Sequence, residues 1–147
     1  RKVMMKLAVP LFTGTAAGAV VGVASGVLMA KWTGFGSDIL YGISAKSVTT
    51  PVAVVITESL GGITSLAAVM VMIAGIGGAV MHGYVFKIFR ITSHLGRGMG
   101  MGSASHAIGT AELMKDSQLE GSISTVAMVA SAIIVSFITP GLVSWFV

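Results

Sequence analysis

The sequence has no cysteine and very little charge, and each absence excludes a class of protein or site. Without cysteine the chain forms neither disulfides nor thiolate metal sites, although this leaves the redox compartment open. Charged residues make up 10% of the chain, against ~25% in a typical soluble domain. Too little charge remains to cover a water-facing surface. Hydrophobic residues at 54% and a mean hydropathy of +0.95 indicate an integral membrane protein instead.

Two further patterns are missing from the sequence. Basic and aromatic residues do not alternate as they do along a nucleic-acid groove, so the net charge of +4 does not indicate a nucleic-acid partner. The basic residues fall in short runs between apolar segments, which is typical of membrane orientation. No cleavable signal pattern precedes the first apolar run, and residue 1 is arginine. We therefore expect further N-terminal sequence to precede this chain.

Three apolar segments are long enough to cross a bilayer, whose hydrocarbon core is ~30 Å thick. They are residues 7–30, 63–86 and 122–147. In the first segment, Gly14, Gly18, Gly22 and Gly26 recur at every fourth position. This spacing puts the glycines on one face of a helix, where we expect another helix to approach closely.

Two polar interruptions are the most informative feature of the apolar sequence. Residues 44–51 read Ser-Ala-Lys-Ser-Val-Thr-Thr-Pro, and residues 103–110 read Ser-Ala-Ser-His-Ala-Ile-Gly-Thr. Ionisable groups within a bilayer are costly and usually mark a path for a substrate or an ion. The interruptions lie in residues 39–60 and 95–114, and each of these segments could be a full span or a re-entrant hairpin.

The positive-inside rule distinguishes these topologies. With Arg1, Lys2 and Lys6 placed in the cytoplasm, two crossing segments give four basic residues on each side of the membrane. If both segments are re-entrant, seven basic residues lie inside and only Lys31 lies outside. If only the first segment is re-entrant, six basic residues lie inside and two lie outside. The rule thus favours the first hairpin strongly and the second weakly. Lys46 is excluded from the count because it would lie at membrane depth.

The resulting order of span, hairpin, span, hairpin and span describes an inverted repeat. The Ser-Ala pairs that begin the two interruptions are 59 residues apart. We predict one transmembrane domain, with a first repeat at about 7–60, a second at about 66–119 and a final span at about 122–147. Inverted repeats with broken helices are common in secondary transporters. The predicted fold class is an all-α integral membrane protein, a polytopic helical bundle with two re-entrant, broken-helix hairpins.

The first interruption has the chemistry of an anion site. Pro51 suits the first position of a half-helix, which Thr49 or Thr50 could cap. The N-terminus of this half-helix would favour an anion, and Lys46 adds a full positive charge. Together these groups predict a seat for a small carboxylate. Two alternatives stay open: Lys46 could snorkel to the membrane surface, and the hydroxyls could satisfy freed backbone groups.

The second interruption has related chemistry. Gly109 permits a sharp turn, and Thr110 could cap a short helix that carries Glu112. His106 could donate to a carboxylate, carry a proton, or serve only as a structural hydrogen-bond partner. The predicted substrate-binding residues of both interruptions are Ser44, Lys46, Ser47, Thr49, Thr50, Pro51, Ser103, Ser105, His106, Gly109 and Thr110.

We do not expect an enzyme. Ser105, His106 and Glu112 superficially suggest a hydrolase triad, but the sequence has no Gly-x-Ser-x-Gly nucleophile elbow. We also expect no cofactor and no metal site.

Both interruptions resemble signatures of the LrgB/CidB family of antiholin-like membrane proteins. Residues 42–51, Gly-Ile-Ser-Ala-Lys-Ser-Val-Thr-Thr-Pro, resemble the first signature. Residues 97–111, Arg-Gly-Met-Gly-Met-Gly-Ser-Ala-Ser-His-Ala-Ile-Gly-Thr-Ala, resemble the second, except that Ser103 stands where threonine is expected. The resemblance covers essentially the whole chain. It implies a multi-pass protein of the cell membrane that acts with a small LrgA/CidA-like membrane protein.

The resemblance leaves two functions open. The family was named for the control of murein hydrolase release and autolysis, whereas related proteins, including a plastid fusion, are associated with transport of glycolate, glycerate or pyruvate. Our leading hypothesis is a carrier for a small monocarboxylate of this type or lactate, with protons as a candidate coupling ion. The alternative is a holin/antiholin-type regulator of murein hydrolase export, and a weaker one is a scaffold for the partner. The glycine face would suit self-association as a homo-oligomer or docking of the partner.

Overall fold

The computed structural model describes residues 2–146, with side chains described for residues 8–145, and these residues are all helical apart from short connections. Arg1 and the side chains of Lys2 and Lys6, which entered the charge count, lie outside this description. The elements are α1 (Lys2–Trp32), α2 (Ser37–Ser44), the 3₁₀ helix η1 (Ala45–Ser47), α3 (Thr50–Ser59), α4 (Thr64–Ile88), α5 (His94–Asp116) and α6 (Gln118–Phe146). The predicted all-α class is confirmed.

Three of these helices are long and apolar enough to cross a membrane, namely Ala8–Trp32, Thr64–Ile88 and Gln118–Trp145. At ~1.5 Å per residue the shortest of them, at 25 residues, exceeds the ~30 Å hydrocarbon core. Large apolar side chains cover their outer surfaces; Val80 is 71% exposed and Phe137 is 82% exposed. The three predicted spans are therefore confirmed as long apolar helices, candidate membrane spans by length and composition. The last one begins earlier than predicted, so that Glu120 lies within its first turn.

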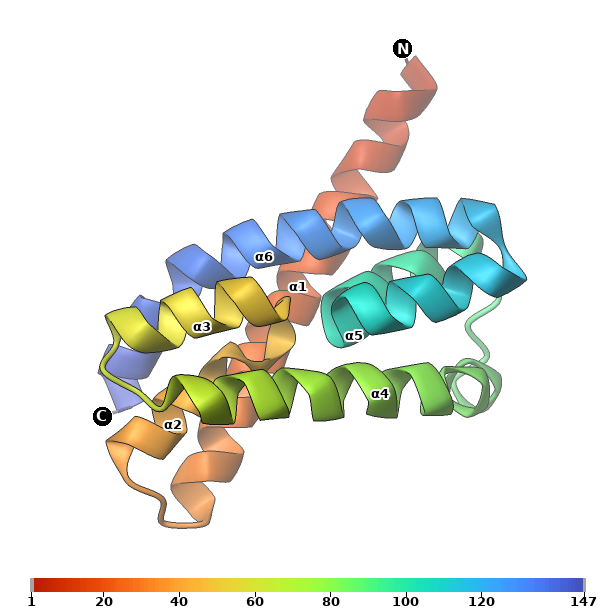
Figure 1. Ribbon diagram of the computed structural model, residues 1–147. Helices are drawn as coiled ribbons and strands as arrows, with labels where there is room; N and C mark the ends of the chain where they lie inside the picture. The colour runs from red at the N-terminus through yellow and green to blue at the C-terminus, as the bar shows by residue number, and fades with distance from the viewer. Residues whose placement is uncertain (1, 147) are drawn as a thin grey trace.

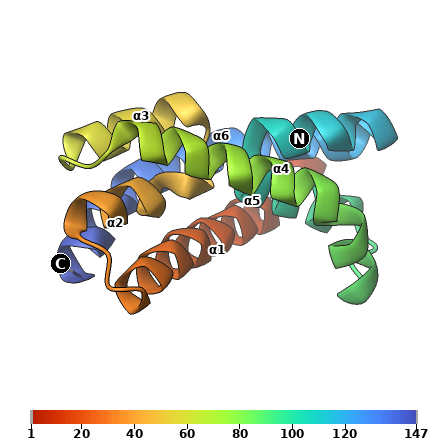
Figure 2. The ribbon, with the colours of Figure 1, turned by 60° about the horizontal axis from the view of Figure 1, so that its bottom comes forward.

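The shorter elements lie between the long ones. Figure 1 shows α3 and the bend of α5 pointing toward each other from opposite ends, with α6 on one side and α4 on the other. Helix α1 runs across this layer and contacts α6, α2, η1 and α5 (Figures 1 and 2). This arrangement brings the two polar interruptions together at the centre of the described chain.

The glycine face of α1 receives both interruptions. A Cβ atom added to Gly18 would lie 2.8 Å from Oγ of Ser103, and one added to Gly22 would lie 2.5 Å from Oγ of Ser47. Real Cβ atoms do not approach this closely, so these positions require glycine if the serines keep their places. The close approach predicted from the four-residue spacing is confirmed, and its partners are the polar interruptions themselves.

Candidate functional site at the meeting of two helix breaks

The first break separates η1 from α3. Val48 is extended, with φ −137° and ψ 177°, and Thr49 occupies the N-cap position of α3 with φ −67° and ψ 150°. Pro51 stands in the first turn, where its missing N–H costs least. No side chain among the described residues caps α3, so the predicted cap by Thr49 or Thr50 is wrong. The first turn of α3 therefore has backbone N–H groups without a side-chain acceptor.

The second break lies within α5, at His106, which has φ 47° and ψ −133°. The sequence had suggested a turn at Gly109, and that expectation is wrong. Gly109 lies inside the helical arm that follows the break, against the Cβ of Ser105, and a Cβ added to it would meet Cε of Met101 at 2.9 Å. Holding a non-glycine residue at positive φ costs on the order of 1–3 kcal/mol. Long-range contacts of His106 must supply this energy.

The two breaks are joined directly. Nε2 of His106 lies 2.9 Å from the backbone oxygen of Lys46, and His106 is only 2% exposed. Because a carbonyl oxygen can only accept, Nε2 must carry the proton and donate it. The other ring nitrogen, Nδ1, is then an acceptor while the ring is neutral and becomes a donor only when the ring is protonated. The bond fixes the tautomer of His106 and ties α5 to η1.

A cavity of about 130 Å³ lies between the breaks. At ~30 Å³ per water molecule it has room for about four waters, or for a solute of a few non-hydrogen atoms. Its lining residues are Thr49, Thr50, Pro51, Val71, His106, Ala107 and Ile108. Four of the predicted site residues are thus brought to one small cavity, from two segments far apart in the sequence.

Lys46 has a different environment from the one predicted. Its side chain lines a separate apolar groove of about 690 Å³, together with residues of α1, α2 and α4 such as Met29, Ile43 and Met70. In this conformation Lys46 contributes its backbone carbonyl to the contact between the breaks, and its ammonium group is not part of the small cavity. Its role as an anion contact stays a prediction.

The four serines of the interruptions are buried in packing contacts. Ser44 Oγ donates to the carbonyl of Tyr41 at 2.8 Å, and Ser103 Oγ donates to that of Met99 at 2.7 Å. Ser47 lies against Gly22 of α1, and Ser105 lies against Gly78 of α4. These contacts support the alternative reading, in which hydroxyls satisfy local backbone groups and small side chains allow close packing.

Thr110 does not cap a helix, as had been predicted. It lies within the second arm of α5, and its Oγ1 is 2.7 Å from Oγ of Ser124 on α6, in a buried hydrogen bond. The bond links the second arm to the final span.

Replacing Thr110 with valine is expected to destabilise the protein by ~0.6–1.7 kcal/mol, the range for hydrogen bonds between membrane helices. The reason is that Ser124, which is fully buried, would lose its partner. Unfolding in detergent would measure the change. Ser122→Ala is the control, since this exposed serine bonds only within its own helix. Equal stability of the two variants would contradict the assigned bond.

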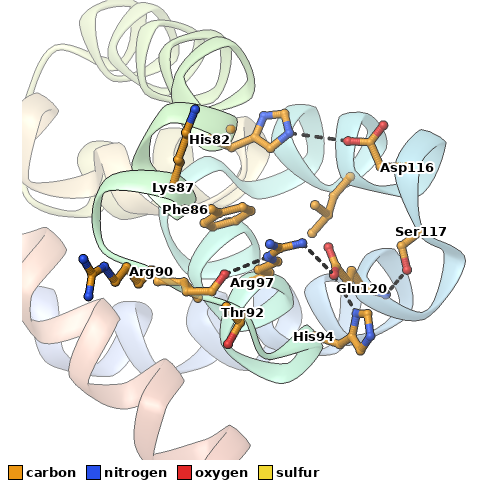
Figure 3. Close-up of a pocket in the computed structure, with 13 residues that line it drawn as sticks. His82, Phe86, Lys87, Arg90, Thr92, His94, Arg97, Asp116, Ser117 and Glu120 are labelled. Atoms are coloured by element: carbon orange, nitrogen blue, oxygen red, sulfur yellow. Dashed lines mark hydrogen bonds and ion pairs between the residues drawn. The ribbon is translucent and has the colours of Figure 1, made fainter.

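A second polar cluster, missed in the sequence, lies where α4 ends and α5 and α6 begin (Figure 3). Glu120 is 3% exposed, and its Oε1 lies 2.7 Å from Nδ1 of His94 and 3.6 Å from an amino nitrogen of Arg97. His82 pairs with Asp116 at 3.6 Å. The available signal was Glu120 itself, a lone carboxylate at the start of an apolar helix. The predicted span began at residue 122, so Glu120 was left outside the helix and its burial was not expected.

The chain is an all-helical membrane protein in which two broken helices meet between the candidate membrane spans. Within this class, the chain belongs to the LrgB-like family, whose family model matches residues 1–145. It is 41% identical to the uncharacterized protein YxaC of Bacillus subtilis (strain 168), over 97% of this chain and 62% of that protein. It is 33% identical to the uncharacterized protein YwbG of the same strain, over 97% of this chain and 64% of that protein.

A third relative comes from another genus. An uncharacterized protein of Haemophilus influenzae (strain ATCC 51907 / DSM 11121 / KW20 / Rd) is 34% identical over 79% of this chain and 50% of its own length. The chain thus spans less than two thirds of the length of the curated relatives it matches. No solved structure matches the chain.

Proposed function

We propose that the protein is a secondary carrier of a small monocarboxylate of the pyruvate, glycolate, glycerate or lactate type. It would be a multi-pass protein of the cytoplasmic (inner) membrane. The observation that carries the proposal is the contact between His106 and Lys46, which joins two helix breaks beside a cavity of about 130 Å³. Broken helices that meet within a bundle are the usual construction of substrate sites in such carriers.

We further propose that α2–η1–α3 and α5 are re-entrant hairpins related by an inverted repeat. Each follows one of the candidate spans, α1 or α4, and α6 is the additional final span. The offset of 59 residues relates η1 at 45–47 to residues 104–106, where α5 breaks. The two tips approach from opposite ends, which supports opposite directions of entry (Figure 1).

The accessible surface of the cavity is mostly apolar in this conformation, and groups that complement a carboxylate lie in the residues around it. The first turn of α3 offers backbone N–H groups and the positive end of the helix dipole, beside the hydroxyls of Thr49 and Thr50. A protonated His106 would donate from Nδ1 while Nε2 keeps its bond to Lys46. Anion binding would thereby be coupled to uptake of a proton on His106. In this proposal the Lys46 side chain reaches the anion only in another state of the transport cycle.

The proposed carrier is not an enzyme and uses neither a cofactor nor a metal. Its proposed partner is a small LrgA/CidA-like membrane protein, as the family suggests.

Uptake of labelled pyruvate, lactate and glycolate into proteoliposomes that contain the intact protein, with and without the partner, tests the proposal. We expect saturable uptake that the other monocarboxylates compete with and that an inward proton gradient accelerates. Lys46→Ala is expected to slow uptake, and a wild-type rate would remove Lys46 from the site. Absence of uptake under both conditions would contradict the carrier. Release of neutral dyes at similar rates would favour the holin-type alternative.

A further inference from the structure

A cleft of about 790 Å³ lies away from the cavity between the breaks. It is formed where α4 ends and where the two arms of α5 meet α6 (Figure 3). At ~1.5 Å per residue, its lining residues on α5 lie roughly 10 to 18 Å along the arms from His106. Three permanent cations, two histidines and two carboxylates line it, a net charge of +1 with the histidines neutral. The cleft therefore has an excess of positive charge, and its location makes it a separate site from the proposed carrier cavity.

Both carboxylates of the cleft are already paired. Glu120 accepts from His94 and lies beside Arg97, and Asp116 faces His82. Arg97 is held further by its Nε–H, which donates to the carbonyl of Ile91 at 2.9 Å. Its guanidinium group also lies 5.4 Å from the centre of the Phe86 ring. These contacts form a wall in which Arg97 balances the charge of Glu120, and Asp116 lies beside His82, which is charged only when protonated.

Lys87 and Arg90 supply the excess charge. Among the described residues neither side chain has a hydrogen bond or an ion pair, and Figure 3 shows both charged ends directed away from Glu120. Arg90 has φ 52°, and its backbone N–H bonds to the carbonyl of Lys87 at 3.3 Å. This tight turn after α4 places both exposed side chains at the edge of the cleft.

The surface beside these cations is apolar. Tyr84, Ile88 and Phe89 are 74%, 73% and 72% exposed, in the last turn of the candidate span and directly after it. Exposed aromatic residues next to basic ones at the end of a span are typical of the membrane interface. An anion bound here would have its charge at the headgroup level and apolar protein surface below it.

We propose that this cleft binds the phosphate of an anionic phospholipid, with Lys87 and Arg90 as its ligands and the acyl chains along the exposed face of α4. Basic pockets between membrane helices bind lipid phosphates in this way. Arginine also matches a phosphate with two parallel hydrogen bonds. A bound lipid would bridge the end of α4 to the paired wall of α5 and α6. Lipid binding at this cleft does not depend on which solute the protein carries.

The test measures binding of phosphatidylglycerol, phosphatidylcholine and inorganic phosphate to the intact protein in detergent, by native mass spectrometry. The variant is Lys87→Gln/Arg90→Gln, and Lys31→Gln/Lys115→Gln is the control that removes the same charge elsewhere. At ~1 kcal/mol per basic residue, the double variant is expected to bind phosphatidylglycerol about 30-fold more weakly. The control is expected to change little. Thermal unfolding would show that both variants are folded.

Three outcomes would overturn the inference. An equal loss of affinity for phosphatidylglycerol in the variant and the control would show that only the net charge of the protein matters. Equal affinity for phosphatidylcholine would remove the requirement for an anion. Displacement of the lipid by inorganic phosphate at comparable concentration would show a site for a soluble phosphate compound instead of a lipid.

Discussion

Replacing His106 with glycine is expected to leave the protein folded and to lower the initial rate of monocarboxylate uptake roughly 10- to 150-fold, the equivalent of one hydrogen bond to a charged group at ~1.5–3 kcal/mol. Glycine accepts the backbone conformation at this position, φ 47°, without strain. The substitution therefore removes the bond to Lys46 and the free Nδ1 while it relieves the local backbone. Radiolabelled uptake into proteoliposomes, with thermal unfolding of the same preparation, measures both effects.

His106→Asn separates a structural role from a role in transport. Asparagine can donate to the Lys46 carbonyl, as His106 does, but it has no nitrogen that takes up a proton. We expect this variant to keep the break and to lose the acceleration by a proton gradient. His82→Gln is the control for loss of an imidazole, because His82 lies in the polar cluster at the end of α4, away from the two breaks. Full uptake with an intact proton dependence in folded His106→Gly would exclude His106 from the carrier mechanism.

The location of the spans and of the interruptions could be predicted because both depend on local composition. A run of about 24 apolar residues has few other stable environments, and a run of hydroxyls beside Lys46 or His106 interrupts it visibly. The glycine face of α1 followed from periodicity in the same way. In each case a short window of sequence contained the information.

The detailed geometry of the site depends on contacts that no local window contains. Local preference places a turn at Gly109, yet the break falls at His106, because the Lys46 carbonyl and the space at Gly78 compensate for an unfavourable backbone. The direction of the Lys46 side chain is decided by the groove between α1, α2 and α4. Glu120 was missed for a similar reason, since its partners His94 and Arg97 are more than 20 residues away in sequence.

The second prediction concerns the stability of a variant at Gly78, a glycine of α4 that lies against Ser105. We expect Gly78→Ala to be less stable than Gly77→Ala by about 1–3 kcal/mol, the usual cost of overpacking. A Cβ atom on Gly78 would overlap Oγ of Ser105 and lie 2.6 Å from its Cβ, whereas one on Gly77 would meet nothing within 4 Å. Both substitutions gain the same helix propensity, ~1 kcal/mol, so their difference isolates the contact. Chemical unfolding in one detergent measures it.

The same pair of variants tests how the break of α5 is held in place. Ser105 directly precedes His106, so displacement of Ser105 from α4 would also move the imidazole from the Lys46 carbonyl. Gly78→Ala is therefore expected to slow uptake as well as to lose stability, and Gly77→Ala to do neither. Adding Ser105→Gly, which removes the overlapping side chain, should recover much of the loss, as expected for residues in direct contact. Independent effects of the two substitutions would mean that the close approach of Ser105 to α4 does not hold the break.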